Sequence, residues 1–207
     1  GDIYEGEGKS DQFDGSGKMT LKSGVVYEGA FKQGKRNGNG VQLYPDGSKY
    51  TGTWLNDKRN GPGTLVKKDG SQYTGSFKDD LFQGEGKLRA ANGDEYLGAF
   101  DKGHMNGQGA LTFSDGSVYT GSFVNDKRTG QGTLKRPSGS QYTGAWKDNK
   151  RHGQGTQSLL SNGVVIGDYV GEYRDDIPYS PSGKFKVVLK DGKVVFATYR
   201  DKLFYLP

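Results

Sequence analysis

A tyrosine recurs every 23 residues through most of this 207-residue sequence. The seven copies are Tyr4, Tyr27, Tyr50, Tyr73, Tyr96, Tyr119 and Tyr142. Each tyrosine is followed two residues later by a glycine. In every copy but the first, which has Gly8, an aromatic residue follows after two more positions: Phe31, Trp54, Phe77, Phe100, Phe123 and Trp146. A fixed period of this length indicates a repeat architecture, in which each unit packs on its neighbours in sequence.

Each repeat predicts a β-hairpin. Strand alternation places Tyr119, Gly121 and Phe123 on one face, and the returning strand 130–134 carries glycines and a leucine on that same face. An Asp-Gly or Asn-Gly pair then closes many of the units, which is the chemistry of a tight turn that needs positive φ. A glycine on the apolar face leaves space over the backbone, so we expect rings of one hairpin to stack on glycines of the next.

The G-x-G of each repeat has a second interpretation in the stretch 126–135, where Lys127 and Arg128 precede Gly130. Glycine-rich turns beside cations can hold phosphate groups. A nucleotide site needs one such loop at the start of a helix, whereas this motif occurs seven times and no helical period follows any copy. The glycines are therefore predicted to be architectural.

The predicted fold is all-β: an elongated, twisted, single-layer antiparallel sheet of tandem hairpins, each advancing the sheet by roughly 10 Å. We expect seven in-register repeats over residues 4–155, and a degenerate eighth repeat with a C-terminal cap over residues 156–207. Residues 185–196 indicate a closing hairpin, and the apolar tail 203–206 is expected to cover the open end. The composition agrees, because 36 glycines, 13 tyrosines and 10 phenylalanines accompany only 31% hydrophobic residues.

Two stretches carry the resemblance to a known family: "YTGTWLNDKRNGPGTLVKKDG" (50–70) and "YTGSFVNDKRTGQGTLKRPSG" (119–139). They resemble MORN repeats, the membrane occupation and recognition nexus motif. The resemblance implies an array of β-hairpins with no catalysis and no cofactor. It also implies binding of acidic phospholipid, self-association, or docking of partner peptides or domains. The implied location is intracellular, at the cytoplasmic face of a membrane or on the cytoskeleton.

Catalytic and metal sites are not expected. His104 and His152 are the two histidines, and the repeat register places both in variable tip loops two hairpins apart. That separation is about 20 Å, so they cannot share a metal ion. The absence of cysteine excludes thiol catalysis and thiolate metal sites. The sequence therefore predicts a protein that is not an enzyme.

Departures from the repeat are expected to carry the function. Four predicted tip loops hold a basic pair: Lys35-Arg36, Lys58-Arg59, Lys127-Arg128 and Lys150-Arg151. The two central ones hold Leu81-Phe82 and His104-Met105 instead. Because a one-layer sheet has no second layer, part of its aromatic face should form an open groove. The leading hypothesis is a scaffold that binds a protein or peptide partner through Tyr50, Trp54, Tyr73, Phe77, Leu81, Phe82, Tyr96, Phe100, Met105, Tyr119, Phe123, Tyr142 and Trp146.

Alternatives remain for each of these features. The basic pairs could bind anionic membrane lipid, or serve only to keep the sheet edge soluble. The rings could be used entirely in stacking, and Leu81 and Phe82 could fold back onto the sheet. Nucleic acid is the least favoured partner, because the cations and rings lie on different surfaces and the net charge is only +5. A half-covered aromatic face also predicts a homodimer, formed through the apolar C-terminal hairpin and its tail.

Overall fold

The computed structural model describes residues 1–207 and consists of antiparallel β-strands joined by turns. None of its elements is a helix that could cross a membrane. The chain divides into two compact units, unit 1 over residues 1–104 and unit 2 over residues 105–207. The all-β class and the tandem hairpins predicted from the 23-residue period are confirmed in both units.

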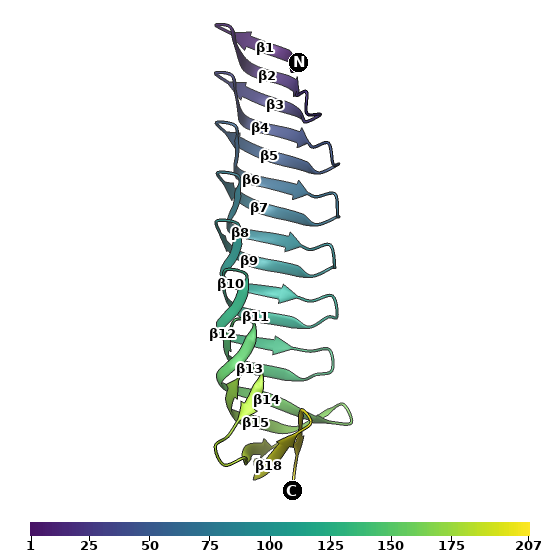
Figure 1. Cartoon of the computed structure of the whole chain (residues 1–207), viewed down its shortest axis with the longest axis vertical. Helices are drawn as coiled ribbons and strands as arrows, with labels where there is room; N and C mark the ends of the chain where they lie inside the picture. The colour runs from purple at the N-terminus through teal and green to yellow at the C-terminus, as the bar shows by residue number, and fades with distance from the viewer. The chain divides into compact units, whose positions relative to one another are not determined.

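In unit 1, each strand pairs with the next strand along the chain, so sequence order and sheet order coincide (Figure 1). Consecutive partners are antiparallel and their registers repeat from one hairpin to the next. The strands are β1 (Ile3–Lys9), β2 (Gln12–Thr20), β3 (Val26–Lys32), β4 (Lys35–Leu43), β5 (Lys49–Leu55), β6 (Lys58–Val66), β7 (Gln72–Lys78), β8 (Leu81–Arg89) and β9 (Glu95–Asp101).

Unit 2 continues the same pattern and then departs from it. Its strands are β10 (His104–Thr112, whose first residue belongs to unit 1), β11 (Val118–Val124), β12 (Lys127–Lys135), β13 (Gln141–Lys147), β14 (Lys150–Ser161), β15 (Val164–Arg174), β16 (Ile177–Tyr179), β17 (Phe185–Leu189), β18 (Val194–Arg200) and β19 (Leu203–Tyr205). β15 pairs with both β16 and β17, and β18 then pairs with β17 and β19. The closing hairpin expected over residues 185–196 is present.

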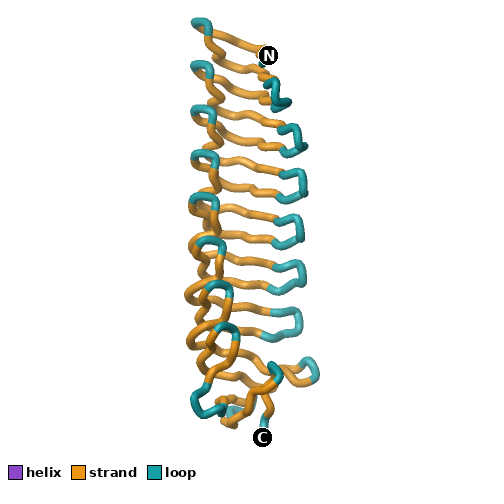
Figure 2. The backbone as a smooth tube through the Cα atoms, in the orientation of Figure 1, coloured by secondary structure: helices purple, strands orange, loops and turns teal.

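Within each unit the loops alternate between two edges, and the two kinds of loop differ (Figure 2). At one edge a loop of two residues joins consecutive strands. Asn56 and Asp57 form one such loop, and their φ angles of 48° and 70° are both positive. This is the type I′ geometry that matches the twist of paired strands. At the other edge the Asp-Gly loops are longer. There the Gly47 N–H donates to the Tyr44 carbonyl (3.0 Å), and the Ser48 N–H donates to the Asp46 carboxylate (2.8 Å).

The tight turns therefore lie at the edge opposite to the one the sequence indicated. The strands extend further than expected at the edge that was predicted to carry tip loops. Lys58 and Arg59, for example, are the first two residues of β6. The same holds for the other basic pairs, which occupy the first two positions of β4, β12 and β14. The prediction that they lie in tip loops was wrong.

A bulge interrupts the hairpins at the same place in the repeat. Gly52 pairs with Gly63 and Trp54 with Arg59, so the single residue Thr53 faces three residues of β6. Equivalent register shifts follow Gly29, Gly75, Gly121 and Gly144. Bulges of this kind bend the strand that carries them. The bend curves each hairpin, and the side chains of the ring-bearing face gather on one side of it.

The tyrosine of each repeat lies over two cross-strand glycines of its own hairpin. A Cβ added at Gly86 would come within 2.6 Å of Tyr73 Cε2, and one added at Gly75 would come within 2.6 Å of the Tyr73 hydroxyl. That hydroxyl donates to the Ser76 carbonyl (2.8 Å), which fixes the ring in place. The rings were expected to stack on glycines of the next hairpin; instead they lie on glycines of their own.

Within each unit the second aromatics of the repeats join these tyrosines into a series of ring contacts, which we call the ring ladder. Trp54 contacts the rings of both Tyr27 and Tyr50, with centroids 5.3 and 5.1 Å apart and planes nearly perpendicular. Phe77 likewise bridges Tyr50 and Tyr73 at 5.0 and 5.1 Å. In unit 2, Trp146 bridges Tyr119 and Tyr142 at 5.2 Å from each. Edge-to-face pairs of this kind contribute about 0.5–1.5 kcal/mol each beyond the burial of their area.

We expect Gly86→Ala to destabilise the protein by about 3 kcal/mol or more, because the new methyl group would displace the Tyr73 ring from the ladder. Gly70→Ala is the matched control. Gly70 has a φ of +85° but no atom within 4 Å of an added Cβ, so its substitution adds only backbone strain of about 1–2 kcal/mol. Urea unfolding of both variants measures the difference. Equal losses would contradict the ring-on-glycine account.

Two tyrosine hydroxyls make a second matched pair. The Tyr142 hydroxyl donates to the Ala145 carbonyl (2.9 Å), whereas the buried Tyr173 hydroxyl has no hydrogen-bond partner. We expect Tyr142→Phe to lower the free energy of unfolding by about 1 kcal/mol, and Tyr173→Phe to leave it unchanged or raise it. Thermal unfolding of the two variants tests this; a larger loss at Tyr173 than at Tyr142 would refute it.

Candidate functional site

The rings predicted to form an open groove are buried. Tyr50, Tyr73, Tyr96, Tyr119 and Tyr142 are at most 1% exposed. Their partners Trp54, Phe77, Phe100, Phe123 and Trp146 are at most 4% exposed. The expectation of an open aromatic groove is corrected here. The tyrosines lie flat on backbone, the second aromatics close their edges, and a further layer of side chains covers the ladder. Most of the rings therefore expose little surface to a partner, and they act on a binding surface by supporting the side chains that cover them.

Arginines make up much of that covering layer. Arg59 is the second residue of β6, next to the tight turn. Its Cζ lies 5.6 Å from the centroid of the Tyr50 ring and 5.3 Å from the centroid of the Phe77 ring. Its backbone N–H donates to the Asp80 carboxylate (2.9 Å), and its Nη2 donates to the Asp80 carbonyl (3.0 Å). Arg36 is held in the same way by Asp57 and lies over Trp54.

The basic pairs are consequently split between two environments. The arginines Arg36, Arg59, Arg128 and Arg151 lie on rings, while the lysines Lys35, Lys58, Lys127 and Lys150 are exposed. Lys58 and Lys127 also have ion pairs, with Asp79 (3.9 Å) and Asp148 (3.6 Å). None of these pairs presents two unshared cations to solvent, which weakens the case for lipid binding. That role stays a prediction.

The central departures from the repeat also join the covering layer. Phe82 occupies the register position of the arginines and stacks on Tyr73, with centroids 3.7 Å apart and planes at 8°. Leu81 beside it is 46% exposed, and Met105 is half-buried. Leu81 and Phe82 belong to unit 1, whereas Met105 begins unit 2. His152 lies in β14 rather than in a tip loop, with its Nδ1 3.4 Å from the Asp175 carboxylate.

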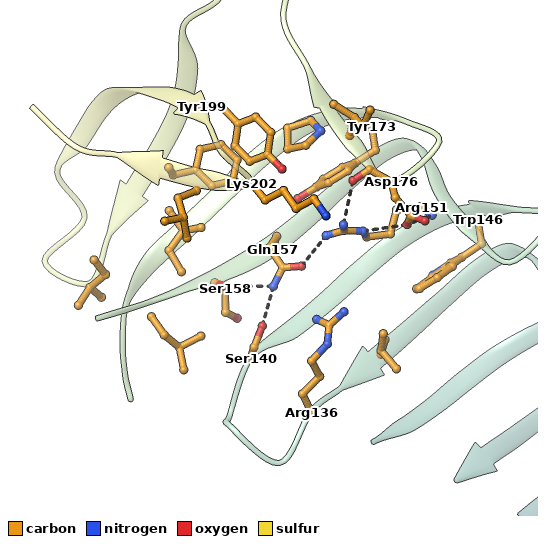
Figure 3. Close-up of a pocket in the computed structure, with 18 of the residues that line it drawn as sticks. Arg136, Ser140, Trp146, Arg151, Gln157, Ser158, Tyr173, Asp176, Tyr199 and Lys202 are labelled. Carbon is orange, nitrogen blue, oxygen red and sulfur yellow. Dashed lines mark hydrogen bonds and ion pairs between the residues drawn. The ribbon is translucent and has the colours of Figure 1, made fainter. Parts of the chain in front are cut away.

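A cavity of about 700 Å³ in unit 2 is the best-formed concave site, and we call it the C-terminal pocket. It lies between the last regular hairpins and the chain that follows β18 (Figure 3). Its lining combines aromatic, aliphatic and charged side chains: Trp146, Tyr173, Tyr199 and Phe204; Leu134, Leu159, Leu160, Ile166, Leu203 and Leu206; and Arg128, Arg136, Arg151, Lys202 and Asp176. Small-molecule and peptide sites commonly have this volume and mixture.

The C-terminal segment supplies the wall that the repeats do not. Phe204 packs its ring 4.9 Å from the centroids of both Tyr169 and Tyr199, and 5.6 Å from that of Phe185. Leu203 beside it remains 59% exposed. The tail expected to cover an open end thus contributes one side of the pocket. Sequence reasoning missed the pocket because residues 199–206 reach it only through the irregular pairing of β15 with β16 and β17.

One polar network makes the floor of the pocket rigid. Arg151 donates from its Nε to the Asp176 carboxylate (3.2 Å) and from its Nη1 to the Gln157 side-chain carbonyl (3.1 Å) (Figure 3). Gln157, only 7% exposed, donates in turn to the Ser140 hydroxyl (2.8 Å). The Arg151 Cζ lies 4.7 Å from the Tyr173 ring centroid. The charge of Asp176, the single carboxylate of the lining, is therefore shared with Arg151.

Arg128 lies over Trp146, with its Cζ 4.7 Å from the ring centroid, but its partner differs from those of the other arginines. Asn149 takes the place of the aspartate, accepting from the Arg128 backbone N–H (2.9 Å) and Nε (3.4 Å). Burial is the main cause that lowers the Arg128 pKa; Tyr119 and the Asp176 carboxylate oppose this shift, and the charge of Arg136 adds to it. Arg128 thus has no carboxylate hydrogen-bonded to it, and the Asp176 carboxylate, which forms an ion pair with Arg151, acts on its charge without pairing with it.

A family model for the MORN repeat matches the chain seven times in succession, over residues 4–26, 27–49, 50–72, 73–95, 96–118, 119–141 and 142–159. The chain belongs to the MORN repeat family. Each MORN match begins at one of the ladder tyrosines, so the family period and the structural period coincide. The last two matched repeats supply part of the pocket lining, including Arg128, Trp146 and Arg151, and residues beyond 159 supply the remainder.

Solved structures resemble the MORN array in fold at low sequence identity. The CPAP G-box domain, whose structural analysis is reported to suggest a role in centriole elongation, has a TM-score of 0.51 at 13% identity, covering 90% of this chain and 94% of that one. The Drosophila melanogaster SAS-4 (dCPAP) TCP domain, in complex with a proline-rich motif of Ana2 (dSTIL), has a TM-score of 0.48 at 12% identity, with coverages of 94% and 96%. A sequence search of curated proteins gave no match.

We expect the fold to weaken as the pH rises from 10 towards 12. Burial raises the pKa of Tyr27, Tyr50, Tyr73, Tyr119, Tyr142 and Tyr169 from 10.0 to about 12. Folding therefore favours the neutral phenol, and this stabilisation is complete below pH 10 and lost as the pH rises through the folded-state pKa. Circular dichroism and tyrosinate absorbance, followed together against pH, should change in one transition. Full ionisation of the tyrosines at pH 10 with the β-sheet intact would contradict it.

Proposed function

We propose that this MORN array is a non-catalytic scaffold that binds a segment of a protein partner at the C-terminal pocket. The observation that carries the proposal is the composition of the pocket wall. Rigid rings and arginines held by hydrogen bonds stand beside exposed aliphatic side chains such as Leu203 and Ile177, which are 59% and 60% exposed. Aromatic residues and arginine are the types on which protein interfaces concentrate their binding energy.

The pocket also has the rigidity that a docking site needs. Trp146 is 4% exposed, and its Nε1 donates to the Gly132 carbonyl (3.1 Å), so its ring cannot turn away. Arg151 is held by Asp176 and Gln157, as described above. A partner that binds to walls already in place loses less conformational entropy than one that must order them.

The chemistry of the lining supports binding over catalysis. Its one carboxylate is engaged with Arg151, and neither a histidine nor a cysteine lines the cavity. Burial raises the pKa of the Tyr173 hydroxyl, so it stays protonated and is no base near neutral pH. General acid–base catalysis needs a group that titrates near the working pH and reaches the substrate. The side chains that line the pocket therefore suit a scaffold better than an enzyme.

We expect Leu203→Asp to weaken peptide binding about tenfold or more, because it would place a charge on the apolar wall of the pocket. The full chain would be immobilised and screened against a displayed library of random dodecapeptides. Dissociation constants of the enriched peptides would then be measured by fluorescence anisotropy for the wild type and the variant.

Leu97→Asp is the control for that experiment. Leu97 is 60% exposed on β9 and does not line the pocket, so it matches Leu203 in exposure and chemistry. The control should bind within about twofold of the wild type. Failure to enrich any peptide, or equal losses for the two variants, would reject the proposed function.

A further inference from the structure

The loop residue that faces each ladder arginine carries a negative charge in three of the four cases. Asp57 faces Arg36, Asp80 faces Arg59 and Asp176 faces Arg151, with Nε to carboxylate distances of 3.1–3.2 Å. Arg128 instead faces Asn149, which makes the same hydrogen bonds with a neutral amide. At Arg128, whose Cζ lies over the Trp146 ring in the pocket lining, the geometry is kept and the directly bound carboxylate is lost.

Two other cations of the lining, Arg136 and Lys202, are exposed and form no ion pair, although the charge of Arg136 helps to lower the pKa of Asp115. Arg136 reaches from the loop that follows β12, on the side of the pocket where Ser140 and Gln157 lie (Figure 3). Arg128 and Arg136 line the same cavity, and the charge of Arg136 adds to burial in lowering the Arg128 pKa, against the opposing effect of Asp176. An anion placed against both would relieve this repulsion.

We propose that the C-terminal pocket recognises an acidic, apolar peptide segment, with a carboxylate of the peptide against Arg128 and Arg136 and an apolar side chain against the aliphatic and aromatic wall. This proposal rests on the proposed function and adds the chemistry of the partner. A guanidinium held in a fixed orientation binds a carboxylate by donating charge-assisted hydrogen bonds to its oxygens.

The apolar wall of the pocket favours a peptide over a free anion as the ligand. Leu203 and Leu206 stand with Phe204 on the C-terminal side, and Leu159, Leu160 and Ile166 line the strand side. A phosphate or other small anion would use the cations and leave this wall uncovered. A peptide brings a carboxylate and an apolar side chain within one short segment, so it complements both parts of the pocket.

The variant Asn149→Asp tests whether the missing carboxylate beside Arg128 matters for binding, while the fold is kept. Aspartate is already accommodated at this loop position, since Asp57, Asp80 and Asp176 have φ angles of 70–72°, like the 70° of Asn149. The substitution gives Arg128 the counter-charge found in the other repeats, so the melting temperature should be unchanged or higher. Binding of acidic peptides should fall about tenfold or more, the loss expected for one charge-assisted hydrogen bond.

The probes are the dodecapeptides selected on the wild-type full chain, each paired with a version in which Asp and Glu are replaced by Asn and Gln. We expect the selected peptides to be enriched in Asp and Glu, and to lose affinity when amidated. We also expect Asn149→Asp to affect only the acidic version, which is the signature of a direct coupling. Arg136→Gln, at an exposed side chain that forms no ion pair, should give the same selective loss in a chain of nearly unchanged stability.

Asn56→Asp is the matched control, because it adds the same charge at a hairpin loop outside the pocket; it should leave both affinities within about twofold. Selected peptides that bind equally well in acidic and amidated forms would overturn this inference and leave the proposed function standing. The absence of any selected peptide would overturn both. Complete displacement of the peptide by millimolar inorganic phosphate, or by phosphatidylserine vesicles, would overturn the assignment of a peptide as the ligand.

Discussion

A tyrosine ring can lie flat on a β-hairpin only where the residues beneath it lack side chains. In this chain the requirement is met by a cross-strand pair of glycines under each ladder tyrosine, such as Gly75 and Gly86 under Tyr73. The ring then buries its face on the backbone, and its hydroxyl donates a hydrogen bond to the carbonyl of the residue three positions later, which is Ser76 for Tyr73. One layer of sheet thereby gains a core without the second layer that most β-folds use.

Every other layer of the protein follows from that contact. Tyrosines that lie flat leave their edges open, and the second aromatic of each repeat closes them in edge-to-face geometry. Above the rings the next position on the returning strand is free for a long side chain. Arginine fills it in four repeats because a guanidinium can stack on a ring while its donors reach the adjacent loop. The arginines thus belong to the packing, and only secondarily to the surface charge.

The period in the sequence was enough to predict the strands, the hairpins and the shared face of Tyr119, Gly121 and Phe123, because strand alternation fixes which side chains lie together. It could not reveal the bulge at Thr53, since a three-against-one register leaves no mark in composition. Nor could it reveal that arginines and Phe82 cover the rings, or that the strands extend to Lys58 and Arg59. The pocket was hidden for a different reason: it depends on tertiary contacts of Phe204 with Tyr169 and Tyr199, which no local pattern encodes.

A repeat protein makes single departures from its pattern informative, because neighbouring copies show what the scaffold alone requires. Packing of an arginine on the ladder needs a loop group that accepts its N–H bonds, and aspartate and asparagine meet that need equally well in geometry. They differ in charge alone. At Arg36, Arg59 and Arg151 the aspartate that accepts the N–H bonds also neutralises the cation; at Arg128 the accepting group is neutral, and burial disfavours the charged form. The exception falls in the lining of the C-terminal pocket, so an arginine without a directly bound carboxylate lies where an outside group can reach it.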